Sequence, residues 1–181
     1  MSENKTELGS HDVAFSKTIM TELIMPNDTN PLGNLMGGNL MRWMDIAGGI
    51  CGARHCGAFV VTASLDHVSF RRPIHVGDVI TVTATVTKAF NTSVEVFIEV
   101  TTEEITGHNV ELSNTAYMTF VALDAETKRP IPVPKVNPVT EQEKEFYGGA
   151  SRRREMRLIL GGRMQAADAD HLRELFENLP D

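Results

Sequence analysis

The sequence predicts an α+β fold in which an antiparallel sheet of five to six strands wraps around one long helix. Three observations support this prediction: one strand candidate comes first, a long glycine-rich helical run follows, and four strand candidates then come in succession. Strands joined by short connections form antiparallel sheets, and such a sheet has one apolar face to cover. The single long helix among these strands is the element that covers it.

Periodicity and turn signals predict the elements of the first 56 residues. Residues 1–14 show no hydrophobic periodicity, and we expect a mobile leader there. Residues 15–25 alternate loosely, are rich in β-branched side chains and end at a proline, which indicates a first strand. The next stretch, PNDTNPLGN, has the composition of a turn. A helix from Gly38 to Cys56 follows, roughly 28 Å long at about 1.5 Å per residue.

The four later strand candidates cover residues 59–70, 79–90, 92–105 and 109–124. In the second of them Val82, Ala84 and Val86 alternate with threonines, which is typical of a half-buried strand. Short polar turns at residues 91–92 and 107–108 separate the last three candidates. The sequence therefore predicts hairpins in this region.

The C-terminal part differs in composition from the sheet region. Residues 126–139 contain four prolines and should run as an extended segment. Thr140 and Glu143 match a capping box, which predicts a helix from Thr140 to Leu160. A last short helix carries apolar residues at helical spacing and should dock on another subunit or on the tail itself. We therefore divide the chain into a leader (1–14), a sheet domain (15–137) and a helical extension (138–181).

Charge and composition narrow the functional classes. The net charge of −7 argues against general binding to DNA or to an anionic membrane surface. Cys51 and Cys56 diverge around the helix axis, so we expect reduced thiols rather than a disulfide. We find no apolar signal core and no run of about 18 apolar residues. These features predict a soluble cytoplasmic protein.

One carboxylate, Asp45, interrupts the glycine-rich helix. The stripe expected to face the sheet consists of Leu40, Trp43, Met44, Ala47, Ile50 and Cys51. Asp45 lies at one flank of this stripe, on a strip lined by Gly38, Gly48, Gly49 and Gly52. Two interpretations stay open: close packing of the helix on a partner, or a slot for an extended ligand beside a catalytic carboxylate. Gly37 and Gly38 favour the second, because the first amides of a helix can bind an oxyanion.

Several segments resemble the hot-dog-fold acyl-CoA thioesterases. They are MPNDTNPLGNLMGGNLMRWMDIAGGICGARHC (residues 25–56), SLDHVSFRRPIHVGDVI (64–80) and NTSVEVFIEV (91–100). The resemblance covers roughly residues 15 to 160. Within the family, the chain resembles the cytosolic acyl-CoA hydrolase group, which includes brain acyl-CoA hydrolase and small bacterial thioesterases. It implies two hot-dog subunits that share one continuous sheet, and a homo-oligomer that is commonly a trimer of dimers, a hexamer.

The resemblance also implies a catalytic pair that acts across the dimer interface. The first asparagine of the family's loop motif falls on Asn30, and the acidic residue of its helix falls on Asp45. Family members often have His or Phe before the two glycines, whereas this chain has Met36, which puts a side-chain role there in doubt. The Gly38 amide, with that of Gly37, is then the expected oxyanion donor. Asp45 is either the general base or the nucleophile.

The expected reaction is hydrolysis of acyl-CoA to a free fatty acid and CoA, with no metal and no cofactor. Hydroxyls and amides of Thr92 and Ser93 are candidate contacts for the pantetheine arm. Basic residues are candidates for the CoA phosphates: Arg71, Arg72, Lys88, Arg152, Arg153 and Arg154.

Two other functions compete with hydrolysis. A hot-dog hydratase or dehydratase for acyl thioesters needs a His and Asp pair, but the loop supplies Asn30 and the histidines are scattered in expected surface or turn positions. A non-enzymatic acyl-CoA sensor would usually carry a DNA-binding extension, and this acidic chain shows none.

Overall fold

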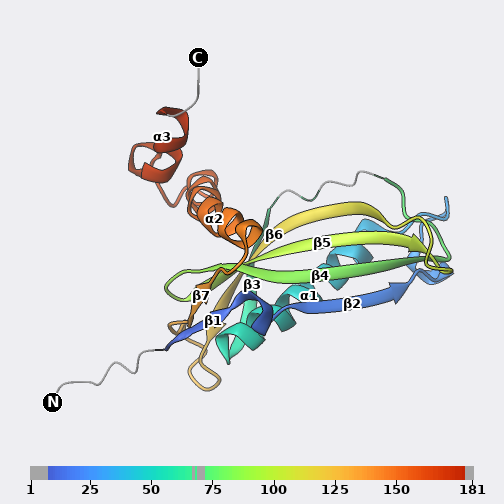
Figure 1. Ribbon diagram of the computed structural model, residues 1–181, viewed down its shortest axis with the longest axis horizontal. Coiled ribbons are helices and arrows are strands. Elements are labelled where there is room, and N and C mark those ends of the chain that lie inside the picture. Colours follow the sequence, from blue (N-terminus) through green and yellow to red (C-terminus); the bar gives the residue numbers. More distant parts are fainter. Residues whose placement is uncertain (1–7, 67, 69–71, 178–181) are drawn as a thin grey trace. The chain divides into compact units, whose positions relative to one another are not determined.

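The computed structural model describes residues 8–66, 68 and 72–177, which form two compact units that divide after Asn137. The first unit contains a five-stranded antiparallel sheet in the order β2-β4-β5-β6-β3 (Figure 1). Its strands are β2 (Thr18–Leu23), β3 (Phe59–Asp66), β4 (Asp78–Ala89), β5 (Ser93–Glu104) and β6 (Glu111–Leu123). The predicted sheet is confirmed, and β2 and β3 are its two edges.

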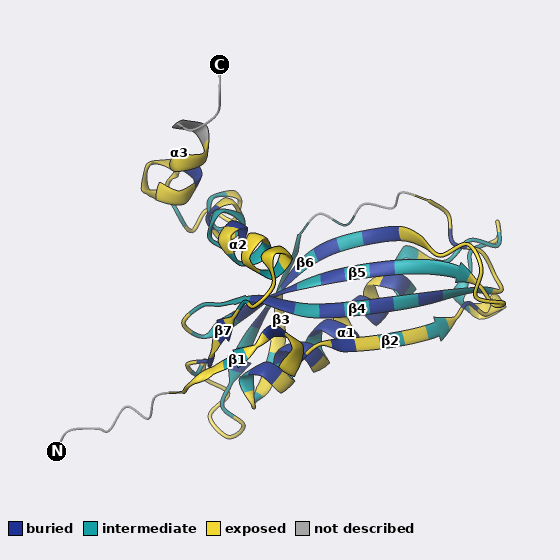
Figure 2. Cartoon of the chain, viewed as in Figure 1, coloured by how far each residue is buried: buried dark blue, intermediate teal, exposed yellow. Residues whose placement is uncertain are grey.

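The sheet packs one apolar face on helix α1 (Gly37–Cys56), as predicted. Inward side chains alternate along the central strands, and Val82, Val96 and Met118 are buried there. Figure 2 shows this burial along β4, β5 and β6, whereas β2 is mostly exposed. The helix ends at Gly57, whose φ of 61° lies in the left-handed region that glycine adopts readily.

The face of α1 turned to the sheet differs in part from the predicted stripe. Leu40, Met44 and Cys51 are buried as expected, but Ile50 is 41% exposed. Gly48, Gly52 and His55 are buried on α1 instead. The stripe is therefore turned toward the glycines, because Ile50 lies roughly 100° around the helix from its centre.

The glycines explain this rotation, and at two of the four positions they correct both interpretations of the glycine strip. A Cβ atom added to Gly48 would lie 2.9 Å from the ring of Phe120 on β6, and one added to Gly52 would lie 3.5 Å from the Phe120 Cβ. Of the four glycines of this strip, Gly38 alone has open space around it. Two of the four glycines thus admit an aromatic side chain of the chain's own sheet, rather than a ligand or a partner backbone.

The expected leader is too long. Residues 10–12 form β1 (Ser10–Asp12), which pairs in parallel with β7 (Lys135–Asn137). A 3-10 turn, η1 (Val13–Phe15), follows, and Val13 is only 3% exposed. Local periodicity could not reveal this strand, because its partner comes from the proline-rich segment more than a hundred residues later. A second 3-10 turn, η2 (Pro26–Asp28), begins the loop before α1.

The second unit contains α2 (Glu141–Leu160), the 3-10 turn η3 (Ala166–Asp168) and α3 (Asp170–Glu177). The predicted capping box at Thr140 and Glu143 is present. The buried Glu155 carboxylate accepts hydrogen bonds from the Leu172 amide at 2.9 Å and from His171 Nδ1 at 2.6 Å. Glu155 therefore fixes the start of α3 against α2, within the tail itself. None of the described helices is long and apolar enough to cross a membrane.

Candidate functional site

Asp45 projects from the exposed side of α1 toward the edge strand β3. Its Oδ1 accepts a hydrogen bond from Thr62 Oγ1 at 2.5 Å. A β-bulge lies between Thr62 and Ser64, and bulges re-aim the side chains around them. Thr62 was not among the predicted site residues. Its local sequence gives no signal, because threonines recur throughout these strands and only the packing of β3 beside α1 distinguishes this one.

The start of α1 carries two backbone amides that have no acceptor among the described residues. The Asn39 and Leu40 amides donate to the Met36 carbonyl at 3.0 and 3.2 Å. Met36 is the N-cap and provides no side-chain acceptor for the helix. The amides of Gly37 and Gly38 are therefore available at the positive end of the helix dipole. A developing oxyanion is a suitable ligand for such a position.

Asn30 is held by the loop that precedes α1. Its Oδ1 accepts hydrogen bonds from the amides of Leu32 at 2.9 Å and Asn34 at 3.2 Å. The loop is fixed in turn to the next segment, because the Leu35 amide donates to the Ile74 carbonyl at 2.7 Å. The Asn30 Nδ2 group makes no hydrogen bond to the described residues. Asn30 is therefore oriented and keeps a donor for another molecule.

A single chain does not bring these groups together. Gly37 and Asp45 are eight residues apart on α1, which is about 12 Å at about 1.5 Å per residue. The part of the first unit that the structure describes also leaves apolar side chains exposed on this side: Met41, Ile46 and Ile50 on α1, and Phe59 and Val61 on the edge strand β3. Exposed apolar surface along a sheet edge marks a site of association.

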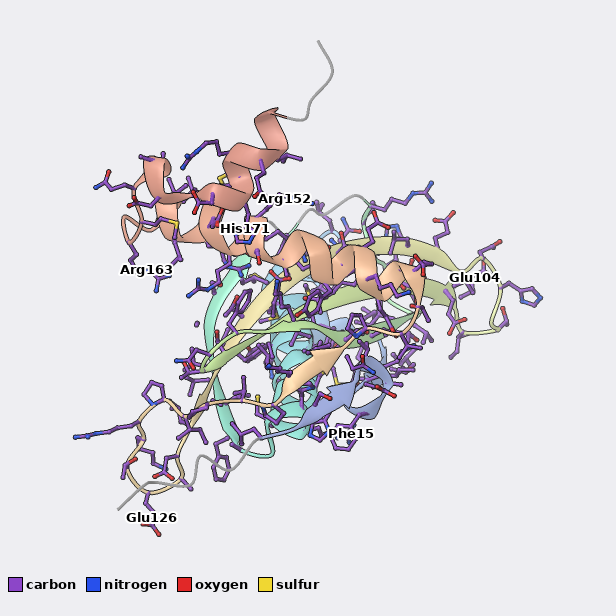
Figure 3. All side chains as sticks on the ribbon, turned by 60° about the vertical axis from the view of Figure 1, so that its left-hand side comes forward. Phe15, Glu104, Glu126, Arg152, Arg163 and His171 are labelled. Carbon is purple, nitrogen blue, oxygen red and sulfur yellow. The ribbon has the colours of Figure 1, made fainter. Side chains whose placement is uncertain are left out.

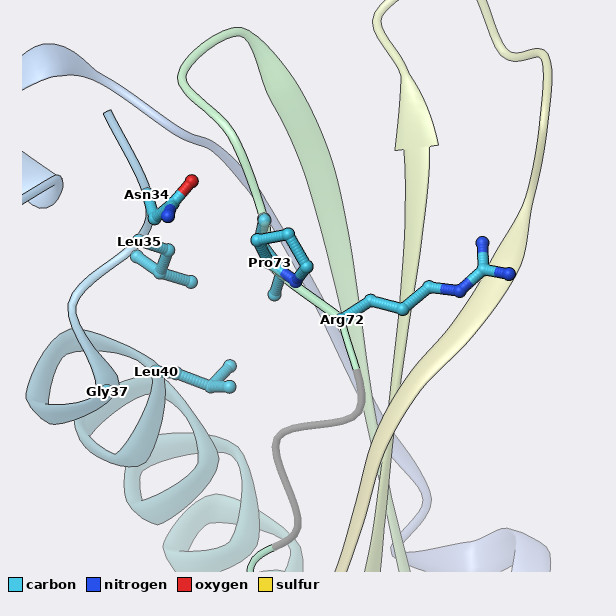
Figure 4. Close-up of a pocket in the computed structure, with 7 residues that line it drawn as sticks. Asn34, Leu35, Gly37, Leu40, Arg72 and Pro73 are labelled. Atoms are coloured by element: carbon cyan, nitrogen blue, oxygen red, sulfur yellow. The ribbon is translucent and has the colours of Figure 1, made fainter. Parts of the chain in front are cut away.

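A pocket of about 390 Å³ opens beside the start of α1. Figure 4 shows that Asn34, Leu35 and Leu40 lie across from Pro73, while the Arg72 side chain extends away from them. The pocket is lined by Asn34, Leu35, Gly37, Leu40, Arg72, Pro73 and Ile74. Gly37 thus belongs both to the free helix start and to this pocket.

The candidate CoA contacts belong to several segments of the chain. Arg71 lies outside the described residues, and Arg72 forms an exposed ion pair with Glu111. Arg72 also borders a hollow that contains Asp78, Glu103 and Glu104. This acidic surrounding does not favour a polyphosphate beside Arg72.

The other candidate contacts lie on two separate units. Thr92 and Ser93 form the β4–β5 turn, where the Phe90 amide donates to the Ser93 carbonyl at 2.8 Å. Lys88 Nζ lies 5.9 Å from the centre of the Phe90 ring near this turn. The remaining three arginines, Arg152, Arg153 and Arg154, belong to α2, and Figure 3 labels the first of them. Arg153 Nη2 donates to the Phe146 carbonyl at 2.7 Å.

The cysteines and the histidine of α1 are structural. Burial raises the pKa of the Cys51 thiol to about 11 and that of Cys56 to about 12, so neither forms a thiolate at neutral pH. His55, expected at the surface or in a turn, is fully buried instead. Its Nε2 lies 3.1 Å from the Pro134 carbonyl, an acceptor, so Nε2 carries the proton. His55 therefore joins α1 to the segment before β7.

Known proteins similar to this chain are named as acyl-CoA thioesterases or acyl-CoA hydrolases. Residues 32–107 match the family model described as thioesterase superfamily. An uncharacterized acyl-CoA thioester hydrolase of Bacillus subtilis, YkhA, is 41% identical over 138 residues, which are 76% of this chain and 80% of that protein. The crystal structure of an apo-hexameric acyl-CoA thioesterase matches with a TM-score of 0.81 at 37% identity, over 84% of this chain and 97% of that one.

An acyl-CoA hydrolase from Staphylococcus aureus is also similar. Solved with butyryl coenzyme A, coenzyme A and coenzyme A disulfide, it matches with a TM-score of 0.78 at 36% identity, over 85% of this chain and 95% of that one. Structures of three variants, in which an aspartate, a threonine or an asparagine is replaced by alanine, match with TM-scores of 0.77, 0.77 and 0.80. From the fold and these similarities, the chain belongs to the thioesterase superfamily and, within it, to the hot-dog-fold acyl-CoA thioesterases.

Proposed function

We propose that this chain hydrolyses acyl-CoA thioesters to a free acid and CoA in a site that two copies of the chain complete. The activity is that of its relatives, which are named as acyl-CoA thioester hydrolases at 35–41% identity over most of this chain. The observation that supports the location is the hydrogen bond between Asp45 and Thr62 beside an apolar, uncovered sheet edge.

Asp45 is the proposed reacting carboxylate. As a general base it takes a proton from a water molecule whose oxygen attacks the thioester carbonyl; as a nucleophile it attacks that carbon itself, and water then opens the anhydride. In both routes the carbonyl oxygen becomes an oxyanion, which the amides of Gly37 and Gly38 stabilise. The carbon–sulfur bond then breaks. In the base route Asp45 returns its proton to the CoA sulfur, whereas in the nucleophile route CoA leaves as a thiolate and takes up the proton that water releases when it opens the anhydride. Neither route requires a metal or a cofactor.

Thr62 and Asn30 position the reacting groups in this proposal. The Thr62 hydroxyl donates to Asp45 and so fixes the carboxylate. Asn30 directs its Nδ2 donor to the water or to the carboxylate of the other copy. The three residues replaced in the Staphylococcus aureus variants are spaced along that chain as Asn30, Asp45 and Thr62 are here. This shared spacing supports the same three positions in this chain.

The second copy supplies what a single chain lacks. Pairing through β3 would cover Phe59 and Val61 and would bring Asn30 and the α1 start of one copy to Asp45 of the other. The hexameric relative supports a further assembly into a trimer of dimers. We further propose that the assembly works in the cytoplasm and in lipid metabolism. Its candidate contacts with CoA are also proposals. They are Arg71, which lies outside the described residues, and Lys88, Thr92, Ser93, Arg152, Arg153 and Arg154; the acidic neighbours of Arg72 make it the least favoured of the candidates.

Release of the CoA thiol from a chain-length series of acyl-CoAs tests the proposal. Asp45→Ala should lower kcat by about 10²–10⁴-fold, the usual contribution of a positioned acid–base group. Asn30→Ala should lower kcat by about 10²–10³-fold, as the loss of a positioned amide donor does. Thr62→Val should lower kcat by roughly 10- to 100-fold, since it removes one hydrogen bond to a charged carboxylate.

Thr21→Val is the matched control, because Thr21 is an exposed threonine on the opposite edge strand and contacts Thr81. It should leave kcat unchanged. Full activity in Asp45→Ala contradicts the mechanism, and wild-type binding of acyl-CoA without turnover would favour a sensor. Hydration of an enoyl-CoA in place of thiol release would favour the hydratase.

A further inference from the structure

The pocket beside the start of α1 has mainly apolar walls. Leu35, Leu40, Pro73 and Ile74 supply carbon surface, and Leu40 and Ile74 are only 1% and 5% exposed. A group that enters this space therefore meets the edge of the hydrophobic core. At about 390 Å³ the pocket lies at the small end of the roughly 300–1,000 Å³ usual for ligand pockets. A chain of a few carbons fits such a space.

Besides Arg72, whose side chain extends away, Asn34 is the polar side chain in this lining, and its side chain makes no hydrogen bond to the described residues. Its Oδ1 is buried and unpaired in the described structure. Its Nδ2 makes no hydrogen bond to the described residues and is not among the buried unpaired atoms, so the NH₂ end of the amide is the accessible end. An unpaired buried polar group costs about as much as a lost hydrogen bond, so its presence here needs an explanation.

The loop does not need the Asn34 side chain. Its backbone amide donates to Asn30 Oδ1 at 3.2 Å, and its carbonyl accepts from the Asn30 amide at 2.8 Å. These backbone bonds hold residue 34 in place whatever its side chain is. The unpaired amide is therefore explained better by a ligand in the pocket than by the fold.

We propose that this pocket takes the acyl group of the substrate and that Asn34 selects short acyl groups with an oxygen substituent, namely hydroxyacyl and oxoacyl thioesters. This inference rests on the proposed function, in which the thioester carbonyl binds the amides of Gly37 and Gly38. Asn34 Nδ2 donates to a hydroxyl or ketone oxygen, and a half-turn of the amide presents Oδ1 to a hydroxyl proton. Gly37 lines the same pocket, so the carbonyl and its substituent reach both groups together.

The acyl group fits this pocket better than the CoA arm does. The acyl group ends within a few bonds of the carbonyl and gains from apolar walls. The CoA arm has to continue to a charged nucleotide that stays in water. A site that hydrogen-bonds a substituent also discriminates strongly against an analogue that lacks it.

The test compares kcat/KM for three substrates of equal chain length: butyryl-CoA, 3-hydroxybutyryl-CoA and acetoacetyl-CoA. Wild type should prefer each of the two oxygen-bearing substrates over butyryl-CoA by roughly 10- to 100-fold, the worth of one satisfied buried polar group. Asn34→Leu removes both donor and acceptor from a side chain of similar size. It should bring both ratios close to one.

Asn34→Asp is the matched variant, because it keeps the shape and an acceptor but has no N–H donor. It should keep the preference for 3-hydroxybutyryl-CoA, whose hydroxyl donates a proton, and lose the preference for acetoacetyl-CoA. This pair of ratios decides the assignment even if Asn34→Leu fails to fold.

Two results would overturn the inference. If the wild-type ratios of kcat/KM are near one, the enzyme does not recognise the oxygen substituent. If Asn34→Asp lowers kcat/KM equally for all three substrates, Asn34 binds the CoA part that they share. Failure of the proposed hydrolase function can be told apart from failure of this inference, because the wild-type protein would then release no thiol from any of the three substrates.

Discussion

The two long helices begin in opposite ways. At the start of α2, the Thr140 hydroxyl accepts from the Glu143 amide at 3.2 Å, and the Glu143 carboxylate accepts from the Thr140 amide at 2.9 Å. At the start of α1, Met36 provides no such acceptor and two glycine amides have none among the described residues. The first start is built for helix stability. The second forgoes that stabilisation and leaves its donors for a substrate.

Loss of one open donor should have the largest effect of the changes at these helix starts. Gly37→Pro removes the amide hydrogen, and proline is favoured at the first helical position, where Met36 before it is already extended. We expect kcat to fall by about 10²–10³-fold, as for other oxyanion donors. Gly37→Ala keeps the amide and serves as the control. Equal kcat values in the two variants would remove Gly37 from the oxyanion site.

A cap added to α1 should stabilise the helix and slow the enzyme. Met36→Ser places a hydroxyl where it can accept from the amide of Gly38 or Asn39, as N-cap serines do. The free energy of unfolding should rise by about 1 kcal/mol. The kcat for acyl-CoA should fall, because the hydroxyl competes with the oxyanion for the amide. A cap that stabilises the protein without lowering kcat would contradict the role given to this helix start.

Loss of the cap on α2 should have the smallest effect on activity. Thr140→Ala should cost about 1 kcal/mol of the stability of the C-terminal unit, the usual cost of a lost N-cap. Its kcat should stay at the wild-type level, because the capped amides of α2 bind no substrate. Thermal unfolding and thiol release measured on the same sample separate the two effects, and a large drop in kcat would contradict the distinction between the two starts.

The two helix starts also show which structural features could be predicted from the sequence. The capping box at Thr140 is local, since its two partners are three residues apart, and it was predicted correctly. The range of α1 was predicted to within one residue, and Asn30 and Asp45 came from the family resemblance. The sites they form stay a prediction until the variants are measured.

The features that could not be predicted from the sequence depend on contacts between distant segments. Val13 is buried because β1 pairs with β7, and nothing in the first fourteen residues signals this. Gly48 reads equally well as a ligand slot or as packing until the ring of Phe120 is placed over it. The contact of Thr62 with Asp45 requires the bulge in β3 and its position beside α1.

The most direct test of the shared site mixes two inactive variants. Asn30→Ala and Asp45→Ala are unfolded together, refolded as a mixture and assayed for thiol release from acyl-CoA. If each site takes Asn30 from one copy and Asp45 from the other, random pairing leaves about a quarter of the sites intact in a two-fold symmetric dimer. The account therefore predicts recovery of about a quarter of the wild-type activity. If the mixture stays as inactive as its components, both residues belong to one copy and the shared site is contradicted.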